Sequence, residues 1–299
     1  MSRPLKSVHG EWTSRWAFIL AATGAAVGLG NIWKFPYIAG EYGGGAFVLV
    51  YLACIFAICV PIMMAEILIG RRGRQNPFNS LASLAEEEKA SSLWKYLGFA
   101  GVLAGFLILS YYSVIAGQAI AYVPRLLFGV FEGVTADGAR NLYLSLVKDP
   151  EKLLAWHTIF MMLTMMIVSR GVQHGLEKSV RFLMPSLFLI LLILVAYAYQ
   201  TGVYFDQAVN FMFKPDFSKL TTEGILTAMG HAFFTLSLGM GAIMVYGSYL
   251  PQKASIFKVS LAISFMDTAV AILAGLAIFP LVFANEMSPG AGPSLIFET

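Results

Sequence analysis

Long apolar stretches separated by short polar segments dominate this chain. Stretches long enough to cross a hydrocarbon core of about 30 Å as a helix, which takes roughly 20 residues, occur near residues 15–36, 44–69, 92–122, 153–169, 178–199, 222–250 and 256–285. The pattern predicts an all-α polytopic membrane protein with one transmembrane domain over residues 1–299. The first stretch continues as a long span without a small-residue cleavage site, so we do not interpret it as a removable signal peptide.

The first and sixth apolar stretches are interrupted near their middles. Residues 21–40 read AATGAAVGLGNIWKFPYIAG, with three glycines before Asn31, and residues 233–242 read FFTLSLGMGA, with a glycine on each side of Met240. Non-helical backbone inside a membrane is tolerated where it lines a cavity or is buried in protein, and paired breaks of this kind indicate a midplane binding site. Unwinding frees carbonyl oxygens for a small cation and turns a helix N-terminus toward an anion. The alternative for Gly24 and Gly28, four residues apart, is a close helix-packing face.

Composition and charge agree with a membrane protein. Hydrophobic residues make up 58% of the chain, charged residues 12%, and the mean hydropathy is +0.72, which leaves too little polar surface for a soluble globule. With the N-terminus in the cytoplasm, 13 of the 20 basic residues fall on the cytoplasmic side, namely Arg3, Lys6, Arg15, Arg71, Arg72, Arg74, Lys89, Lys95, Arg170, Lys178, Arg181, Lys253 and Lys258. The positive-inside rule therefore favours a multi-pass protein of the cell's inner (cytoplasmic) membrane with a cytoplasmic N-terminus. Nothing in the net charge of +3 indicates nucleic acid as a partner.

Signatures of other functions are weak. The four histidines have no spacing that would build a zinc site, and the stretch that begins at Gly28 has Trp33 where a dinucleotide fingerprint needs its third glycine. No set of nucleophile, base and oxyanion donors can be assembled from these spans, so we expect neither enzymatic activity nor an organic cofactor. Cys54 and Cys59, five residues apart on one predicted helix, are expected to point to different faces and to pack rather than form a disulfide.

Four stretches of the chain resemble the neurotransmitter:sodium symporter family, especially its bacterial sodium-dependent amino-acid transporters: GAAVGLGNIWKFP, GGGAFVLVYL, FFTLSLGMGA and SRGVQHGLEKSVRFLMPSLF. The resemblance implies a leucine-transporter-type inverted-repeat fold of five plus five helices, with helices 1 and 6 unwound at the midplane. This chain supplies helices 1–7 and stops in GAGPSLIFET, which resembles the outer loop before helix 8. In the family, helix 8 completes a sodium site and helix 10 supplies an acid to the outer gate. On this resemblance the chain is an N-terminal fragment with an incomplete second repeat and is not expected to transport alone.

The resemblance also implies two sodium sites. The ligands of the first are the Ala26 carbonyl, the side chains of Asn31, Thr235 and Asp267, and the carboxylate of the substrate. The carbonyls of Gly24 and Val27 form half of the second. These are hard oxygen donors, as a hard cation requires.

Asp267 stands where many relatives have asparagine. Together with Ala271, at a position linked to chloride dependence, it implies that chloride is not needed, because a fixed carboxylate already supplies the negative charge. An acid near the midplane is functional by default, since its burial is costly. The alternative is a water-facing acid near the inner end of its helix.

The substrate site implied by the resemblance has two parts. The amides of Leu29 and Gly30 and the Tyr112 hydroxyl hold a carboxylate. The surrounding walls are formed by Ala26, Ile108, Phe234, Ser237 and Met240. Amine transporters of the family carry an aspartate at the position of Gly28, so the neutral site here favours a substrate that brings its own carboxylate. The apolar walls favour a hydrophobic L-amino acid, and the adaptable side chain of Met240 admits large ones.

Three further residues are assigned to gating or bracing. Lys34, where relatives frequently have arginine, and Phe234 belong to the outer gate. Glu66 braces the unwound stretches by accepting backbone N–H bonds, or alternatively lies at the membrane interface four residues before Gly70. His231 occupies a position near the outer gate, and a packing role is equally compatible with the sequence.

The predicted function is symport of sodium and a hydrophobic L-amino acid by alternating access, without a need for chloride. Sodium ions, the amino acid and membrane lipid are the expected partners, and a homodimer is an open alternative. Two other functions stay open: a truncated, non-transporting fragment that binds amino acid or regulates, and a sodium channel. The channel would need a continuous polar pore and would conduct without substrate.

Overall fold

The computed structural model describes residues 12, 15–290, 292 and 294–298, and every regular element in these residues is a helix. In chain order the elements are α1 (Arg15–Ala26), η1 (Gly30–Lys34), α2 (Phe35–Glu41), α3 (Gly45–Cys54), η2 (Ile55–Cys59), α4 (Val60–Gly73), α5 (Pro77–Glu87), α6 (Trp94–Leu127), α7 (Ala136–Val147), α8 (Pro150–Val168), η3 (Val172–Glu177), α9 (Lys178–Tyr199), α10 (Val203–Phe213), η4 (Phe217–Lys219), α11 (Thr222–Thr235), α12 (Ala242–Ser248), α13 (Ile256–Ala284) and α14 (Leu295–Glu298). The elements η1, η2 and η3 are π-helical turns, and η4 is a 3₁₀ turn.

Within the described residues, five helices are long and apolar enough to cross a membrane: Gly45–Gly73, Trp94–Leu127, Pro150–Val168, His174–Tyr199 and Ile256–Ala284. A sixth candidate is the pair Trp16–Ala26 and Gly30–Glu41, which is bent by 48° at its break. The apolar stretch at 222–250 is divided between α11 and α12, which are separated by six non-helical residues, Leu236–Gly241. The predicted interruptions of helices 1 and 6 are therefore confirmed.

Each interruption has a local cause. In the first, α1 ends at Ala26, and the N–H of Gly28 bonds to the Asn31 side-chain oxygen in place of the Gly24 carbonyl that a continuous helix would use. In the second, Ser237, Gly239 and Gly241 have φ angles of 54°, 80° and 75°. A right-handed helix cannot pass through residues in the left-handed region, so α11 ends before them.

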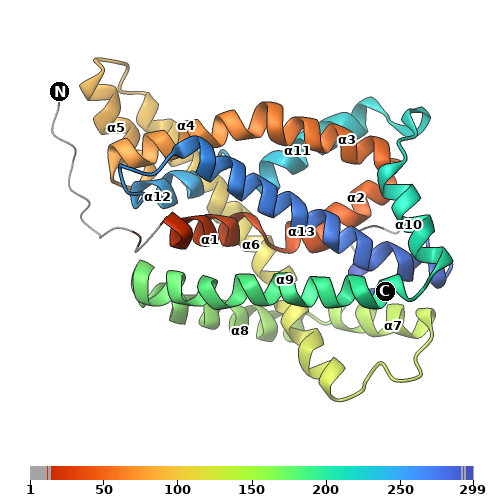
Figure 1. Ribbon diagram of the computed structural model, residues 1–299. Coiled ribbons are helices and arrows are strands. Elements are labelled where there is room, and N and C mark those ends of the chain that lie inside the picture. Colours follow the sequence, from red (N-terminus) through yellow and green to blue (C-terminus); the bar gives the residue numbers. More distant parts are fainter. Residues whose placement is uncertain (1–11, 13–14, 291, 293, 299) are drawn as a thin grey trace.

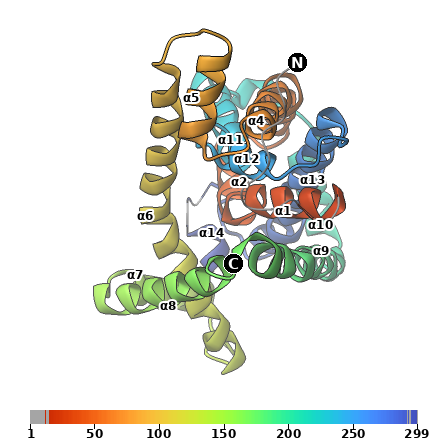
Figure 2. The ribbon, with the colours of Figure 1, turned by 90° about the vertical axis from the view of Figure 1, so that its left-hand side faces the viewer.

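Helix α13 runs through the middle of the molecule and packs against α1, α4, α9 and α10 (Figure 1). Helix α6 stands along one side, where it packs against α5 and α8 (Figure 2). The two interrupted segments are packed against this framework, and α1 and η1 both contact α13. The fold thereby holds both breaks in fixed positions.

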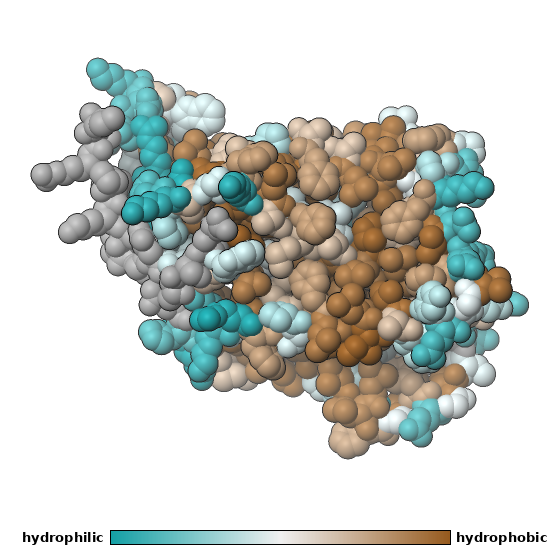
Figure 3. All heavy atoms as spheres, viewed as in Figure 1, coloured by the Kyte–Doolittle hydropathy of each residue, from teal (hydrophilic) through white to brown (hydrophobic). Residues whose placement is uncertain are grey.

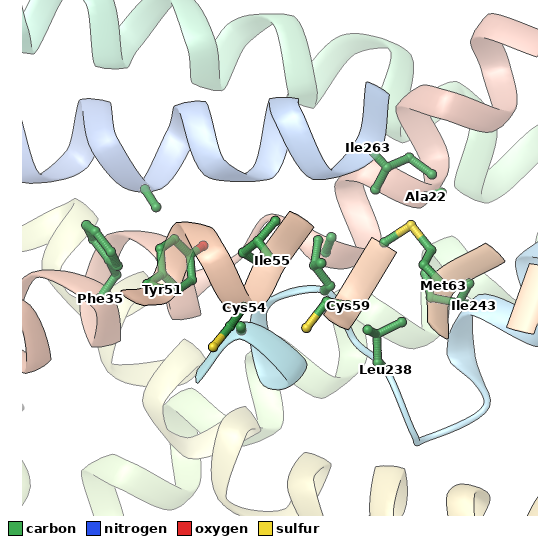
Figure 4. Close-up of a cluster of buried hydrophobic side chains, with 14 of the residues drawn as sticks. Ala22, Phe35, Tyr51, Cys54, Ile55, Cys59, Met63, Leu238, Ile243 and Ile263 are labelled. Carbon is green, nitrogen blue, oxygen red and sulfur yellow. The ribbon is translucent and has the colours of Figure 1, made fainter. Parts of the chain in front are cut away.

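The main core cluster follows α3, η2 and α4 and includes Tyr51, Met63 and, from α13, Ile263 (Figure 4). Cys54 and Cys59 are free and buried in it. The expectation that they point to different faces is wrong, because both thiols point away from α13 in Figure 4. The π-helical turn η2 lies between them and has more residues per turn than an α-helix, so residues five apart come nearly into line.

The surface matches a membrane protein. Hydrophobic residues form a broad band across the middle of the face shown in Figure 3, and hydrophilic residues gather at its two ends. Short helices that the apolar stretches do not predict, α5, α7 and α10, connect the long ones.

Candidate functional site

A cavity of about 310 Å³ lies between the two interrupted segments and α6. Its walls are formed by Gly24, Ala25, Ala26, Val27, Gly28 and Gly30 from the first break, Gly105, Ile108, Leu109 and Tyr112 from α6, and Phe234, Thr235, Ser237 and Met240 from the second. None of these lining residues carries a charged side chain. The cavity is therefore a neutral site with hydroxyl, amide and carbonyl groups on an otherwise apolar wall.

Most of the predicted site residues lie on this wall: Gly24, Ala26, Val27, Gly30, Ile108, Tyr112, Phe234, Thr235, Ser237 and Met240. Others lie behind it or beside it: Leu29, Asn31, Lys34, Glu66 and Asp267. The prediction omits Ala25, Gly105 and Leu109, and considers Gly28 only for its missing charge. Gly105 and Leu109 could have been found from helical spacing, because they share one face of α6 with Ile108 and Tyr112.

Asn31, Thr235 and Asp267 meet directly behind the cavity wall. The Asn31 amide nitrogen donates to Asp267 Oδ1 at 2.8 Å and to the Asp267 backbone carbonyl at 3.1 Å. The Thr235 hydroxyl lies 3.1 Å from each carboxylate oxygen of Asp267. Asp267 is 0% exposed, so the alternative of a water-facing acid is wrong. The hydrogen-bond partners of this carboxylate in the described chain are neutral, and its negative charge is buried without a basic group against it.

Helix α1 ends in a way that leaves carbonyl oxygens beside this cluster. The N–H of Val27 still donates to the Thr23 carbonyl, at 2.6 Å, but the N–H of Gly28 donates to Asn31 Oδ1 at 3.0 Å. The carbonyl of Gly24 therefore loses the partner that a continuous helix would provide, as is usual for the last turn of a helix. The Ser237 hydroxyl donates to the Ala25 carbonyl at 2.9 Å and ties the two interrupted segments together.

The glycines of the first break have two different neighbours. A Cβ at Gly24 would lie 3.0 Å from Val180 on α9, whereas a Cβ at Gly28 would lie 2.6 Å from the Tyr112 hydroxyl. Helix packing thus explains Gly24, but Gly28 makes room for a polar group of the cavity. The helix-packing interpretation therefore applies to Gly24, and the binding-site interpretation applies to Gly28.

Tyr112 is placed for a polar role. Its hydroxyl accepts a hydrogen bond of 3.0 Å from the N–H of Leu29 and lies on the cavity wall. The adjacent Tyr111 is 45% exposed and does not line the cavity. The hydroxyl and the backbone of the first break therefore form one polar edge of the cavity.

Glu66 and Lys34 lie next to the second break. Glu66 is buried, and its Oε1 accepts a hydrogen bond of 2.7 Å from the N–H of Gly239, so the alternative of an interfacial position does not hold. The Lys34 ammonium lies 4.7 Å from the centroid of the Phe234 ring, a cation–π distance. Both contacts join residues of the first repeat to residues of the second.

His231 is packed among aromatic rings. It is fully buried, with its ring centroid 6.0 Å from that of Phe35 and 5.5 Å from that of Tyr51. Neither ring nitrogen is bonded to another described residue. The structure places this side chain in the core, which agrees with the packing role.

The donors near the cavity suit a hard monovalent cation better than a transition metal. In the described part of the chain, no group of three or more His, Cys, Asp and Glu side chains is placed to hold a metal ion. The available ligands are the Asp267 carboxylate, the Asn31 amide oxygen, the Thr235 hydroxyl and backbone carbonyls, all of them oxygen atoms. The Asn31 amide nitrogen donates to Asp267 and is not a ligand.

Comparison with known proteins gives consistent matches. The model of the sodium:neurotransmitter symporter family matches residues 9–130 and 143–288. An uncharacterized sodium-dependent transporter, YhdH of Bacillus subtilis, is 40% identical over 287 residues, which are 96% of this chain and 62% of that protein. An uncharacterized sodium-dependent transporter of Haemophilus influenzae is 35% identical over 295 residues, 96% of this chain and 64% of the relative.

A solved structure matches as well. The crystal structure of MhsT in complex with L-phenylalanine superposes with a TM-score of 0.90 at 43% identity and covers 97% of this chain and 65% of that one. This chain thus spans less than two thirds of the length of each of these three proteins. The likeness extends over nearly all of this chain.

Proposed function

Because the chain belongs to the sodium:neurotransmitter symporter family, we propose that it forms the substrate- and sodium-binding part of a transporter that couples sodium entry to the uptake of a hydrophobic L-amino acid. The family consists of transporters, and an enzymatic activity is not proposed. We further propose that the N-terminus is cytoplasmic and that transport does not need chloride.

The buried carboxylate of Asp267 carries this proposal. It lies within hydrogen-bond distance of Asn31 and Thr235, and its hydrogen-bond partners among the described residues are neutral. A charge in such a place is costly unless a cation neutralises it. Sodium, as a co-substrate, would be held by Asp267 and Thr235 with the Asn31 amide turned to present its oxygen, and with the Ala26 carbonyl. The carbonyls of Gly24 and Val27 are assigned to half of a second site.

The neutral cavity beside this cluster supports an amino acid as the second substrate. Tyr112, with the amides of Leu29 and Gly30, forms the polar edge to which a carboxylate would bind. The apolar residues Ile108, Phe234 and Met240 would surround its side chain. The similar protein MhsT was crystallised in complex with L-phenylalanine, which supports a hydrophobic substrate here.

The proposed mechanism is alternating access. Asp267, Asn31 and Thr235 tie α13 to both breaks, so sodium binding and the position of the broken helices depend on the same side chains. Lys34 and Phe234 would close the outer side of the cavity. The membrane potential supplies roughly 2.3 kcal/mol per 100 mV for each sodium ion, which is enough to concentrate an amino acid against its gradient.

The test uses the full-length protein in proteoliposomes with an inward sodium gradient. Radiolabelled L-phenylalanine should accumulate with sodium but not with potassium, and equally well when chloride is replaced by gluconate. Asp267→Asn should lower the apparent sodium affinity by about tenfold or more, equal to ~1.4 kcal/mol, or should make uptake depend on chloride. Asp206→Asn, at an exposed acid on α10, is the matched control.

Unchanged sodium dependence in Asp267→Asn would overturn the assignment of Asp267. Uptake by the wild-type protein that is equal in sodium and potassium would overturn sodium coupling itself.

A further inference from the structure

The two cysteines of the membrane core are brought together by the π-helical turn η2. Cys54 precedes this turn and Cys59 ends it; both thiols are free, and Figure 4 shows both sulfur atoms on the side of the segment away from α13. The N–H of Val60 donates to the carbonyl of Ile55, five residues earlier, which is the π-helical register. Residues five apart in such a turn are related as residues four apart are in an α-helix, with Cβ atoms about 5–6 Å apart. A single atom bound to both sulfurs can span that distance.

The pair lies next to the second break. Helix α11 packs against α3 and η2, and Leu236 and Leu238 belong to the same buried cluster as both cysteines. In Figure 4, Leu238 lies on the same side of η2 as the sulfur atoms. Cys59 is fully buried and Cys54 is 9% exposed. Because protein interiors are close-packed, a bulky group added between the thiols must push against the residues of the break.

These surroundings select the chemistry of the occupant. Thiol sulfur is a soft ligand, and an apolar core disfavours a net charge. A monovalent soft ion such as Cu(I), held by two thiolates, would leave one negative charge in the cluster. An organic arsenical with trivalent arsenic and one carbon substituent binds two sulfurs and gives a neutral product. Its oxide is also neutral and can reach the pair through lipid.

We propose that Cys54 and Cys59 form a dithiol modification site for trivalent organic arsenicals, and that occupation of this site displaces the second break. Each sulfur forms one bond to arsenic, the bonds between arsenic and oxygen break, and the oxygen leaves as water with the two thiol protons. Arsenic stays trivalent and neither sulfur is oxidised, so the step needs no oxidant or reductant. The site is separate from the substrate cavity, whose described lining includes neither cysteine.

The experiment treats the full-length protein in proteoliposomes with phenylarsine oxide and then with excess β-mercaptoethanol, which removes arsenic held by a single thiol. The mass of the chain should rise by one phenylarsenic group less two hydrogen atoms, and peptide mapping should place the group on the segment that contains Cys54 and Cys59. Dimercaptopropanol, a dithiol, should remove it. Cys54→Ala and Cys59→Ala should each abolish the group at this segment.

A register control keeps two thiols in the same turn but on different faces. Ala57 is three residues after Cys54 and is exposed, whereas both cysteines are buried. The double variant Cys59→Ala with Ala57→Cys should therefore hold no arsenic at this segment after β-mercaptoethanol. Retention of the group in this variant, or its absence from the wild-type protein, would overturn the site.

Hydrogen exchange measures the effect on the second break without any need for substrate. The N–H of Gly239 is held by Glu66, and its exchange requires this bond to open. Amides of the segment Leu236–Gly241 should exchange faster in the arsenical-bridged wild-type protein than in the untreated protein or in treated Cys54→Ala. Dimercaptopropanol should restore the slower exchange. A bridged protein whose exchange in this segment is unchanged would overturn the displacement of the break.

Discussion

At the scale of single residues, we expect substrate binding to be sensitive to substitution at Gly28 and Tyr112, which meet at the N–H of Leu29. The Tyr112 hydroxyl occupies the position that a side chain at 28 would need, and it accepts the Leu29 N–H from there. A methyl group at 28 must push the hydroxyl away. Loss of the hydroxyl in Tyr112→Phe removes the same bond without adding volume.

We therefore expect Gly28→Ala and Tyr112→Phe to weaken substrate binding in a non-additive way. Each should cost about 0.5–1.5 kcal/mol in binding free energy, the usual net value of one hydrogen bond, and the double variant should cost little more than the worse of the two. Equilibrium binding of labelled phenylalanine to the four proteins measures this. Full additivity would show that the two residues act separately.

Glu66 is a second such residue, because one of its oxygens accepts the N–H of Gly239 in the second break. Glu66→Leu leaves that buried N–H without an acceptor and should lower the free energy of unfolding by roughly 1–3 kcal/mol. Glu66→Gln keeps a carbonyl oxygen and should lower it less. Thermal unfolding in detergent compares the two, with the exposed Glu86→Gln as control, and equal losses in both Glu66 variants would contradict the role of the hydrogen bond.

The sequence predicts some of these residues well and others not at all. Asn31, Glu66 and Asp267 stand out because polar side chains within apolar stretches need partners, and the structure supplies partners for each. Their pairing across the chain is visible only through the resemblance to a family or in the structure. Gly105 gives no signal, because a glycine in a membrane helix is common and its meaning depends on what lies opposite.

At the scale of elements, the second break depends on a strained residue. Ser237 is not a glycine but has a φ of 54°, and its hydroxyl holds the Ala25 carbonyl. Residues with a Cβ pay about 1–2 kcal/mol for this conformation. Nothing in the sequence marks Ser237 as left-handed, since the neighbouring glycines carry the obvious signal.

Substitution at 237 separates strain from hydrogen bonding. Ser237→Ala loses the hydroxyl and keeps the strain, whereas Ser237→Gly loses both. Ser237→Gly should therefore be more stable than Ser237→Ala by about 1 kcal/mol, less the larger entropy of the unfolded glycine chain. Thermal unfolding of the two variants tests this, and a glycine variant that is the less stable of the two would argue that the conformation is unstrained.

The sequence predicts the boundaries of the long helices and of the two breaks, but not the π-helical turns or the short helices. The long helices follow the apolar stretches closely, and glycine-rich segments mark the two breaks. The π-helical turns at η1, η2 and η3 are not visible in hydropathy, because one extra residue per turn does not change the composition. The short helices α5, α7 and α10 are not predicted because they are shorter than the membrane-length apolar stretches on which the prediction is based.

At the scale of the whole molecule, the orientation in the membrane can be tested with the native cysteines left in place. Cys54 and Cys59 are buried, so they should give little background with a membrane-impermeant maleimide. Ser92→Cys lies in the exposed link between α5 and α6, and Ser145→Cys is exposed on α7. With a cytoplasmic N-terminus, intact cells should be labelled at 145 only, and permeabilised cells at both. Labelling of 92 in intact cells would reverse the proposed orientation.

Membrane class and helix order follow from hydropathy, but the arrangement in space does not. Apolar stretches alone do not say that α1 lies beside α13 or that the first and sixth stretches share a cavity. The motifs resembling the family supply that arrangement, and the match to a solved structure confirms it. The size and shape of the cavity depend on side-chain packing and needed the structure.

The candidate site combines residues that the ribosome synthesises at widely separated times. Asn31 leaves the ribosome 236 residues before Asp267, and Glu66 leaves 173 residues before Gly239. At 5–20 residues per second, the wait for Asn31 is on the order of 10–50 s. During this interval a nascent chain holds polar groups in or near the bilayer before their partners have been synthesised.

Unpaired polar groups in hydrocarbon are costly, so the half-made protein should be the form that insertion chaperones and membrane proteases recognise. A ligand that binds only the finished site draws molecules out of that pool by mass action. We expect cells grown with sodium and a matching amino acid to accumulate more inserted protein, which makes expression yield a readout of the completed site.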